Sequence, residues 1–321
     1  MKKSIFAATA IVLFGALSAF AQVTETPSPS LNVILDQASQ KSRDYREAFR
    51  NLLADEMKTF EEFDKRGESE KKTTVKSSFL VYQSGKNAKS TAELRNVLEV
   101  NGKPIPDSQK RGEDFLAELD KQTTLESELK KLQGESAKYD KSIKVYGMTL
   151  NQAVALAQNQ RPYFDFKLLG TENFQGMEVY VISYQQTKKS PYVIVNEKSP
   201  RLTPDETSAE FDLSIPGELK KTDIFLRGKF WIDAKTFQVW REERELTARI
   251  NDPVVLVTNV YEYQSSDFGI LVPKTITLTI YNAKKETGDR YNSLKDSNMV
   301  YEYSKFRQTN VEVKILDEET E

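Results

Sequence analysis

The strongest constraint on the fold is a long series of strand-like segments in the second half of the chain. From residue 163 on, short apolar runs alternate with polar residues, and turn-forming residues such as Gly269 and Pro273 separate them. Ile276, Leu278 and Ile280 alternate with threonines, which gives that strand one apolar face. A polar loop is expected over 196–222. The expected strands are 163–169, 178–185, 192–195, 226–233, 238–249, 254–264, 274–282, 299–308 and 311–315.

The first half of the chain has helical spacing instead. Apolar residues at intervals of three, four or seven predict a helix from residue 31 to about residue 63. Strands over 73–83 and 92–100 follow, then a charged helix capped by Asp107 or Ser108 that runs to about residue 132. A further helix is expected over 150–158.

Helices followed by a run of strands predict an α+β fold. We expect a curled antiparallel sheet, an incomplete β-barrel, packed against helices and preceded by a helical extension. The expected organisation is a signal peptide over 1–21, a flexible leader over 22–30, a helix-rich region with a short hairpin over 31–160 and the sheet region over 161–316.

The amino terminus carries an export signal. Lys2 and Lys3 precede an apolar stretch at residues 5–17, and residues 19–21 (AFA) match a signal-peptidase site. An uncleaved membrane anchor is the alternative, but the stretch is shorter than the roughly 20 residues that span a bilayer. The cleaved protein is expected to begin at Gln22, to lack a stable membrane span and to be periplasmic or secreted.

Composition restricts the possible chemistry. The chain has no cysteine and no histidine, so disulfides, Ser-His-Asp catalysis and His-ligated metals are absent. Loss of Lys2 and Lys3 with the leader takes the net charge from −2 to −4, which does not favour nucleic acid. The pairs Glu61-Glu62 and Glu242-Glu243 are interpreted as solvated charge, because adjacent residues do not face each other. We expect no enzyme, no catalytic residue, no metal and no cofactor.

One hairpin resembles a known family. Residues 228–243 (GKFWIDAKTFQVWREE) are similar to a hairpin of the bacterial outer-membrane lipoprotein-sorting family, the periplasmic lipoprotein-carrier fold. The strands over 166–184 and 254–281 extend the likeness to residues 160–315. The resemblance implies an incomplete barrel whose concave apolar side is partly filled by helices and takes up acyl chains of lipoproteins or other hydrophobic ligands. The matching residues are Trp231, Ile232, Asp233, Lys235 and Thr236.

Two functions remain open from the sequence. The first is a carrier that binds a lipid or a lipoprotein acyl chain in the concavity. The second is an envelope interaction or structural module that has the same fold, a protein partner and no ligand. The apolar face of the sheet is either the ligand site or ordinary core, and two tryptophans, Trp231 and Trp240, could form its rim. The candidate face consists of Phe230, Ile232, Val239, Ile276, Leu278 and Ile280.

Overall fold

The computed structural model describes residues 29–49, 52–83, 91–119, 144–145, 149, 152–198, 200, 203, 206–215, 219, 223–249, 253–286 and 290–308. The signal peptide predicted over 1–21 lies outside the described residues. So do residues 120–143, which contain the end of the helix predicted to run to about residue 132.

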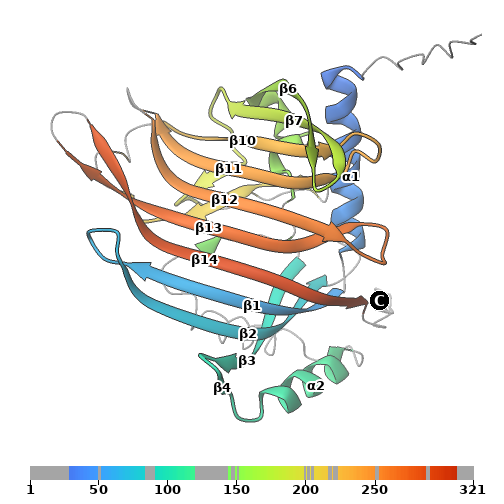
Figure 1. Ribbon diagram of the computed structural model, residues 1–321, viewed down its shortest axis with the longest axis vertical. Coiled ribbons are helices and arrows are strands. Elements are labelled where there is room, and N and C mark those ends of the chain that lie inside the picture. Colours follow the sequence, from blue (N-terminus) through green and yellow to red (C-terminus); the bar gives the residue numbers. More distant parts are fainter. Residues whose placement is uncertain are drawn as a thin grey trace, which may run out of the picture.

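Most of the described chain forms one large antiparallel sheet (Figure 1). Its strands are β1 Leu52–Phe63, β2 Ser69–Gln83, β3 Thr91–Val100, β4 Lys103–Pro104, β6 Phe164–Phe174, β7 Met177–Gln186, β10 Asp223–Asp233, β11 Val239–Arg249, β12 Val254–Ser265, β13 Leu271–Lys285 and β14 Tyr291–Gln308. The spatial order is β4-β3-β2-β1-β14-β13-β12-β11-β10-β7-β6, so the last strand returns to pair with the first. The sheet is open, because β4 and β6 are edge strands among the described residues.

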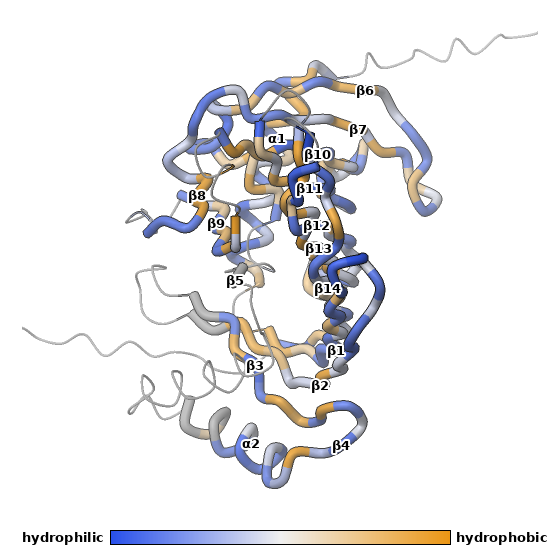
Figure 2. Tube along the Cα trace, turned by 90° about the vertical axis from the view of Figure 1, so that its left-hand side faces the viewer, coloured by the Kyte–Doolittle hydropathy of each residue, from blue (hydrophilic) through white to orange (hydrophobic). Residues whose placement is uncertain are grey.

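The remaining elements are short, apart from two helices. They are α1 Leu31–Ala48, α2 Ser108–Leu119, the 3₁₀ turns η1 Val154–Leu156 and η2 Arg161–Tyr163, and the small sheet of β5 Lys144–Val145, β9 Ala209–Asp212 and β8 Val193–Val195. Figure 2 shows the large sheet from the side: its ends bend toward α1 and the small sheet. We call this inward side of the large sheet the concave face.

The fold is more β-rich than the sequence predicts. A curled, open antiparallel sheet is confirmed, but the helix predicted from 31 to about 63 ends at Ala48, and residues 52–63 form β1. The helix predicted over 150–158 is also wrong: the described part contains the three-residue turn η1. The large sheet joins strands from both sides of the boundary predicted near residue 160.

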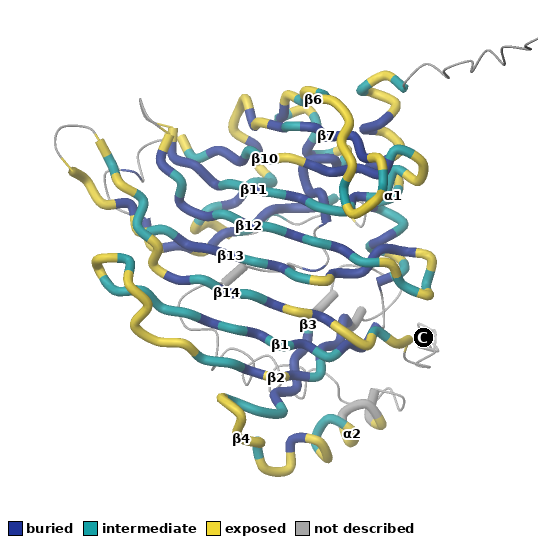
Figure 3. The backbone as a smooth tube through the Cα atoms, viewed as in Figure 1, coloured by how far each residue is buried: buried dark blue, intermediate teal, exposed yellow. Residues whose placement is uncertain are grey.

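Two charged residues explain why β1 was mistaken for a helix. The inward positions of β1 are Leu52, Ala54, Glu56, Lys58 and Phe60, and all five are buried. A strand that is apolar on one face is recognised by strict alternation, and charges at two inward positions remove that signal. Figure 3 shows the resulting burial along the strands, with exposed residues mainly at turns and edges.

Candidate functional site: the concave face

The concave face is organised as rows of residues that are paired from strand to strand. One row runs through Lys58, Tyr301, Ile276, Tyr261 and Glu242 and ends at Phe230 and Ile182. The next row runs through Phe60, Met299, Leu278, Asn259, Arg244, Gly228 and Tyr184. Because paired residues point to the same face, a few charged side chains lie among apolar and aromatic ones on one continuous inner surface.

The structure brings the six predicted apolar residues together. Phe230, Ile232, Ile276 and Leu278 are 0 % exposed, and the other two, Val239 and Ile280, are 1 % and 8 % exposed. All six belong to the main hydrophobic core. The six residues therefore form part of the buried core of this structure.

The two tryptophans predicted as a rim have different positions. Trp231 points to the outer side of the sheet, because it alternates with its inward neighbours and packs with Val179 and Val181. The Arg241 guanidinium stacks over its ring, 5.3 Å from the centroid. Trp240 is the extra residue at the β10–β11 register shift and packs half-buried against the main core. Trp231 therefore does not lie at a rim of the concave face.

A first charged cluster lies at the β1–β3 end of the concave face. Arg95 Nε donates to both carboxylate oxygens of Glu56 at 2.9 Å, and its Nη2 lies 3.4 Å from Glu93. The guanidinium lies 4.9 Å from the ring centroid of Phe79 and 5.5 Å from that of Tyr301. The Glu56 side chain is 0 % exposed and that of Arg95 is 11 % exposed, so the carboxylate of this ion pair is enclosed. Such a pair requires near-complete hydrogen bonding to offset its desolvation.

A second charged cluster lies on β11. Glu242 accepts hydrogen bonds from Arg244 Nε at 3.0 Å and Nη2 at 2.9 Å, and the Tyr184 hydroxyl donates to it at 3.0 Å. The Arg244 guanidinium stacks over Tyr261 at 4.8 Å. Burial, together with the Glu242 charge, raises the pKa of Tyr184 well above its usual value, so this hydroxyl remains a donor at neutral pH.

Gly228 makes the second cluster possible. It lies between Tyr184 and Arg244 in the cross-strand row. A Cβ atom at this position would stand 2.5 Å from the Tyr184 hydroxyl and 2.0 Å from the backbone oxygen of Glu243. The missing side chain therefore lets the Tyr184 ring cross β10 and reach the Glu242 carboxylate.

Two described residues between β5 and β6, Thr149 and Ala153, form hydrogen bonds with the two clusters. Glu93 on β3 accepts hydrogen bonds from the Thr149 backbone N–H at 2.8 Å and from its hydroxyl at 2.6 Å. Glu242 on β11 accepts the Ala153 N–H at 2.9 Å. The Tyr45 hydroxyl of α1 donates to the Thr149 carbonyl at 2.6 Å. We call Thr149 and Ala153 the bridging pair.

The bridging pair is only compatible with a strongly curled sheet. Six strand-to-strand steps separate β3 from β11, which is roughly 29 Å along the sheet at about 4.8 Å a step. Residues four apart reach at most about 14 Å. The two glutamate side chains add only a few ångströms each, so the sheet must bend around the bridging pair. These hydrogen bonds therefore stabilise the curled shape of the sheet.

The sequence-based interpretation missed these charged residues. Glu242 and Glu243 were both expected to be solvated, and the prediction is wrong for Glu242, whose side chain is 0 % exposed, whereas Glu243 is 37 % exposed. The two point to opposite faces, as neighbours on a strand must. The alternation of Val239, Leu246 and Ala248 along β11 could have placed Glu242 inside.

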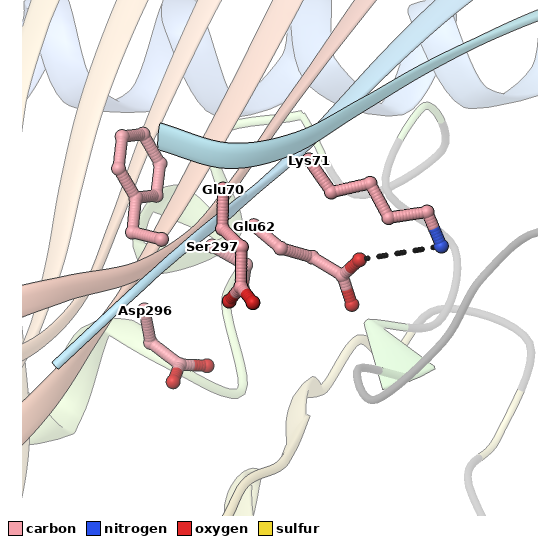
Figure 4. Close-up of a pocket in the computed structure, with 6 residues that line it drawn as sticks. Glu62, Glu70, Lys71, Asp296 and Ser297 are labelled. Carbon is pink, nitrogen blue, oxygen red and sulfur yellow. Dashed lines mark ion pairs between the residues drawn. The ribbon is translucent and has the colours of Figure 1, made fainter. Parts of the chain in front are cut away.

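One described surface hollow lies outside the two clusters. It has a volume of about 510 Å³, lies between the end of β1, the start of β2 and residues 296–297 of β14, and is drawn in Figure 4. Lys71 Nζ lies 3.7 Å from the Glu62 carboxylate there. Its lining is mostly charged: Glu62, Phe63, Glu70, Lys71, Asp296 and Ser297. Across the described ranges, no group of three or more acidic residues is placed to hold a metal ion. Within the same ranges, no helix is long and apolar enough to cross a membrane.

Comparisons with known proteins give structural likenesses. No family model matches the sequence, and no curated protein matches it. A crystal structure assigned to an outer membrane lipoprotein-sorting protein domain from Vibrio parahaemolyticus is similar at 12% identity and a TM-score of 0.34, covering 88% of this chain and 94% of that one. A LolA-superfamily protein from Nitrosomonas europaea gives 10% identity, a TM-score of 0.34 and coverages of 88% and 94%.

A DUF1329-family protein from Desulfovibrio piger is similar at 11% identity and a TM-score of 0.32, with coverages of 89% and 95%. The family that the hairpin at residues 228–243 resembles is thus also found among the similar structures. Likenesses of this size carry no conclusion about function.

Proposed function

We propose that this chain is an exported, non-enzymatic envelope protein that binds a hydrophobic ligand, such as an acyl chain, on the concave face of its open sheet. The apolar part of the site is Phe230, Ile232, Val239, Ile276, Leu278 and Ile280. The site opens when the elements over it move away from the sheet. Export follows from the signal sequence predicted at residues 1–21.

The main support for this proposal is that the concave face is large and is covered by one helix and several short elements, not by a single layer. The long helix α1 runs across the strands (Figure 1). Its 18 residues make it about 27 Å long and about 10 Å wide. The 12 residues of β12 and 15 of β13 give strands of about 40–50 Å, so α1 covers only a band of their length. A second sheet of matching size would cover a permanent core more evenly.

The rest of the described cover consists of very short elements. The turns η1 and η2 have three residues each, and β5, β9 and β8 have two, four and three. Short elements have few hydrogen bonds of their own, so opening would break mainly the hydrogen bonds of Thr149 and Ala153 and the apolar contacts of η1. Movement of these pieces would expose the apolar face while the long strands stay paired.

An interaction module without a ligand is the second candidate. The complete burial of Ile276 and Leu278 favours it, because a dry packed core leaves no room for an acyl chain. In that case the outer face of α1, which carries Asp36, Gln37 and Glu47 exposed to solvent, would offer the contact surface.

The substitution Leu278→Glu separates the two candidates, with Thr277→Glu on the outer face of the same strand as its matched control. In a ligand site that opens to water, the new carboxylate is hydrated, so the fold survives and uptake of a fluorescent fatty acid is lost. In a permanently dry core, an unpaired carboxylate costs several kcal/mol and unfolds the protein. Circular dichroism melting and probe titration measure both effects. Wild-type protein that takes up no acyl probe, together with an unfolded Leu278→Glu variant, would reject the carrier proposal.

A further inference from the structure

The edge strand β6 is open to solvent along one side. It pairs with β7 and ends the large sheet, and among the described residues no strand lies beyond it. Figure 3 shows β6 mostly exposed at this border of the sheet. An open edge can take up a further strand, so proteins usually blunt their edges. The opposite border follows this rule, because β4 has only two residues and one of them is Pro104.

The first five residues of β6 alternate as an interior strand does. Phe164, Phe166 and Leu168 point inward: the first belongs to the main core and the other two pack against it. The outward residues Asp165 and Lys167 are exposed, and neither forms an ion pair within the described part of the chain. The strand therefore offers an incoming strand one apolar side and one charged side.

The backbone of these residues leaves hydrogen-bonding groups at the open edge. The Thr187 N–H donates to the Tyr163 carbonyl at 2.9 Å, so these two residues form a hydrogen-bonded pair of the β6–β7 ladder. Such pairs alternate along an antiparallel ladder, so every second residue counted from Tyr163 directs its N–H and C=O to β7. The intervening Phe166 and Leu168 direct theirs to the open side, where no described backbone group pairs with them.

A β-bulge limits this edge to the same five residues. The register to β7 shifts between Leu168 and Gly170, so Leu169 is the extra residue, and Gly170 has a φ of +141°. A bulge twists the strand and ends regular pairing. Leu169 itself is 49 % exposed, which is unusual for a large apolar side chain among the described residues. The open pairing edge is therefore 164–168, with an exposed leucine directly after it.

We propose that this edge pairs antiparallel with the same edge of a second copy of the chain, about a two-fold axis at Phe166. The register places Asp165 of each copy opposite Lys167 of the other, which forms two ion pairs on the outer side of the sheet. On the inner side Phe166 meets its own counterpart, and Phe164 lies opposite Leu168. A two-fold interface requires this kind of self-complementary surface.

The charges select this register over its neighbours. A two-fold axis at Asp165 would place two carboxylates opposite each other, and an axis at Lys167 would do the same with two ammonium groups. With the axis at Phe166, the register also brings Leu169 opposite Tyr163 of the second copy, which shields it from water. Paired residues point to the same face, so both concave faces would open on the same side of the joined sheet. The inference does not depend on the proposed acyl-chain function.

Sedimentation equilibrium of the wild-type protein at low ionic strength, over about 1–300 µM, tests the dimer, because so short an edge is expected to form a weak interface. Asp165→Lys and Lys167→Asp each place like charges opposite each other, so each should weaken dimerisation at least about tenfold. An equal mixture of the two variants restores both ion pairs and should form a heterodimer. Lys274→Asp, at an exposed lysine of the interior strand β13, is the matched control and should leave dimerisation unchanged. Circular dichroism melting checks that all variants fold.

Cysteine cross-linking tests the register. The chain has no cysteine of its own, so introduced thiols are the only ones present. The Cα atoms of Asp165 and the opposing Lys167 would lie about 4.5 Å apart, within the range of a disulfide. An oxidised mixture of Asp165→Cys and Lys167→Cys should therefore give a covalent dimer, whereas Asp165→Cys alone should give none.

Several results would overturn the proposal. One is a wild-type protein that stays monomeric at every concentration. Others are a mixture of charge variants that does not dimerise and equal cross-linking in Asp165→Cys alone. Assemblies that keep growing beyond a dimer would also overturn it, because they require pairing of β6 with a different edge.

Discussion

The substitution Glu242→Gln tests whether the buried ion pair with Arg244 stabilises the curled sheet. The substitution keeps the size of the side chain and an oxygen that can accept the Ala153 N–H, but it removes the negative charge. Arg244 then remains as an enclosed cation, since its side chain is 4 % exposed. Its neighbour Glu243 provides the control, because it points outward, is 37 % exposed and pairs with Arg241 at 2.8 Å.

The expected magnitudes differ several-fold. Removing one partner of a buried ion pair lowers the free energy of unfolding by about 3–5 kcal/mol. An outward pair of the Glu243 kind contributes about 0–1 kcal/mol. At about 2–4 °C per kcal/mol for a chain of this size, Glu242→Gln should lower the melting temperature by about 6 °C or more, and Glu243→Gln by no more than a few degrees.

Urea titration followed by tryptophan fluorescence and by circular dichroism measures the difference, and agreement of the two signals checks two-state unfolding. The double change Glu242→Leu with Arg244→Met removes the enclosed cation but leaves the Tyr184 hydroxyl and the Ala153 N–H without their acceptor, so it should recover only part of the loss. Equal stability of Glu242→Gln and Glu243→Gln within about 0.5 kcal/mol would refute the assigned role of the pair.

Two further predictions concern residues of the same inner face. Gly228→Ala should lower the free energy of unfolding by about 1–3 kcal/mol, because its Cβ would collide with the Tyr184 hydroxyl and the Glu243 carbonyl; unchanged urea stability would contradict this. Burial, reinforced by the Arg95 charge, lowers the pKa of Lys58 from 10.5 to about 8. Between pH 8 and 10 the unfolded state binds more protons at Lys58, so the free energy of unfolding should rise by about 2 kcal/mol there, and Lys58→Met should abolish that rise in parallel urea titrations.

The local pattern of the second half of the chain was enough to predict its long strands, but the loop expected over 196–222 contains the strand β9 Ala209–Asp212. Ile276, Leu278 and Ile280 alternate with polar residues, and that alternation is a property of the backbone period, independent of partners. The open curled sheet and the single apolar face followed from it. The start of α2 at Ser108 was likewise visible as a capping residue before a charged helix.

The charged residues of the concave face could not be predicted in this way. A lone Glu56, Lys58 or Glu242 in a sequence is expected at the surface, because burial of an isolated charge is unfavourable. Each becomes stable only next to a partner from another strand, as Glu56 does beside Arg95 from β3, 39 residues later in the sequence. The incorrect helix prediction over 52–63 has the same origin, because these charges interrupt the apolar–polar alternation of β1.

The sequence by itself therefore determined the absence of disulfide and histidine chemistry and the apolar face of a strand with uninterrupted alternation, such as β13, and it predicted an export signal at residues 1–21. The tertiary structure alone decided which strands are neighbours, that β1 pairs with β14, and that Glu93 and Glu242 meet across the concavity at Thr149 and Ala153. The physical reason is the sequence separation of the interacting residues. Alternation depends on residues two positions apart, whereas a buried charge is compensated by groups that only the curled sheet brings within hydrogen-bonding distance.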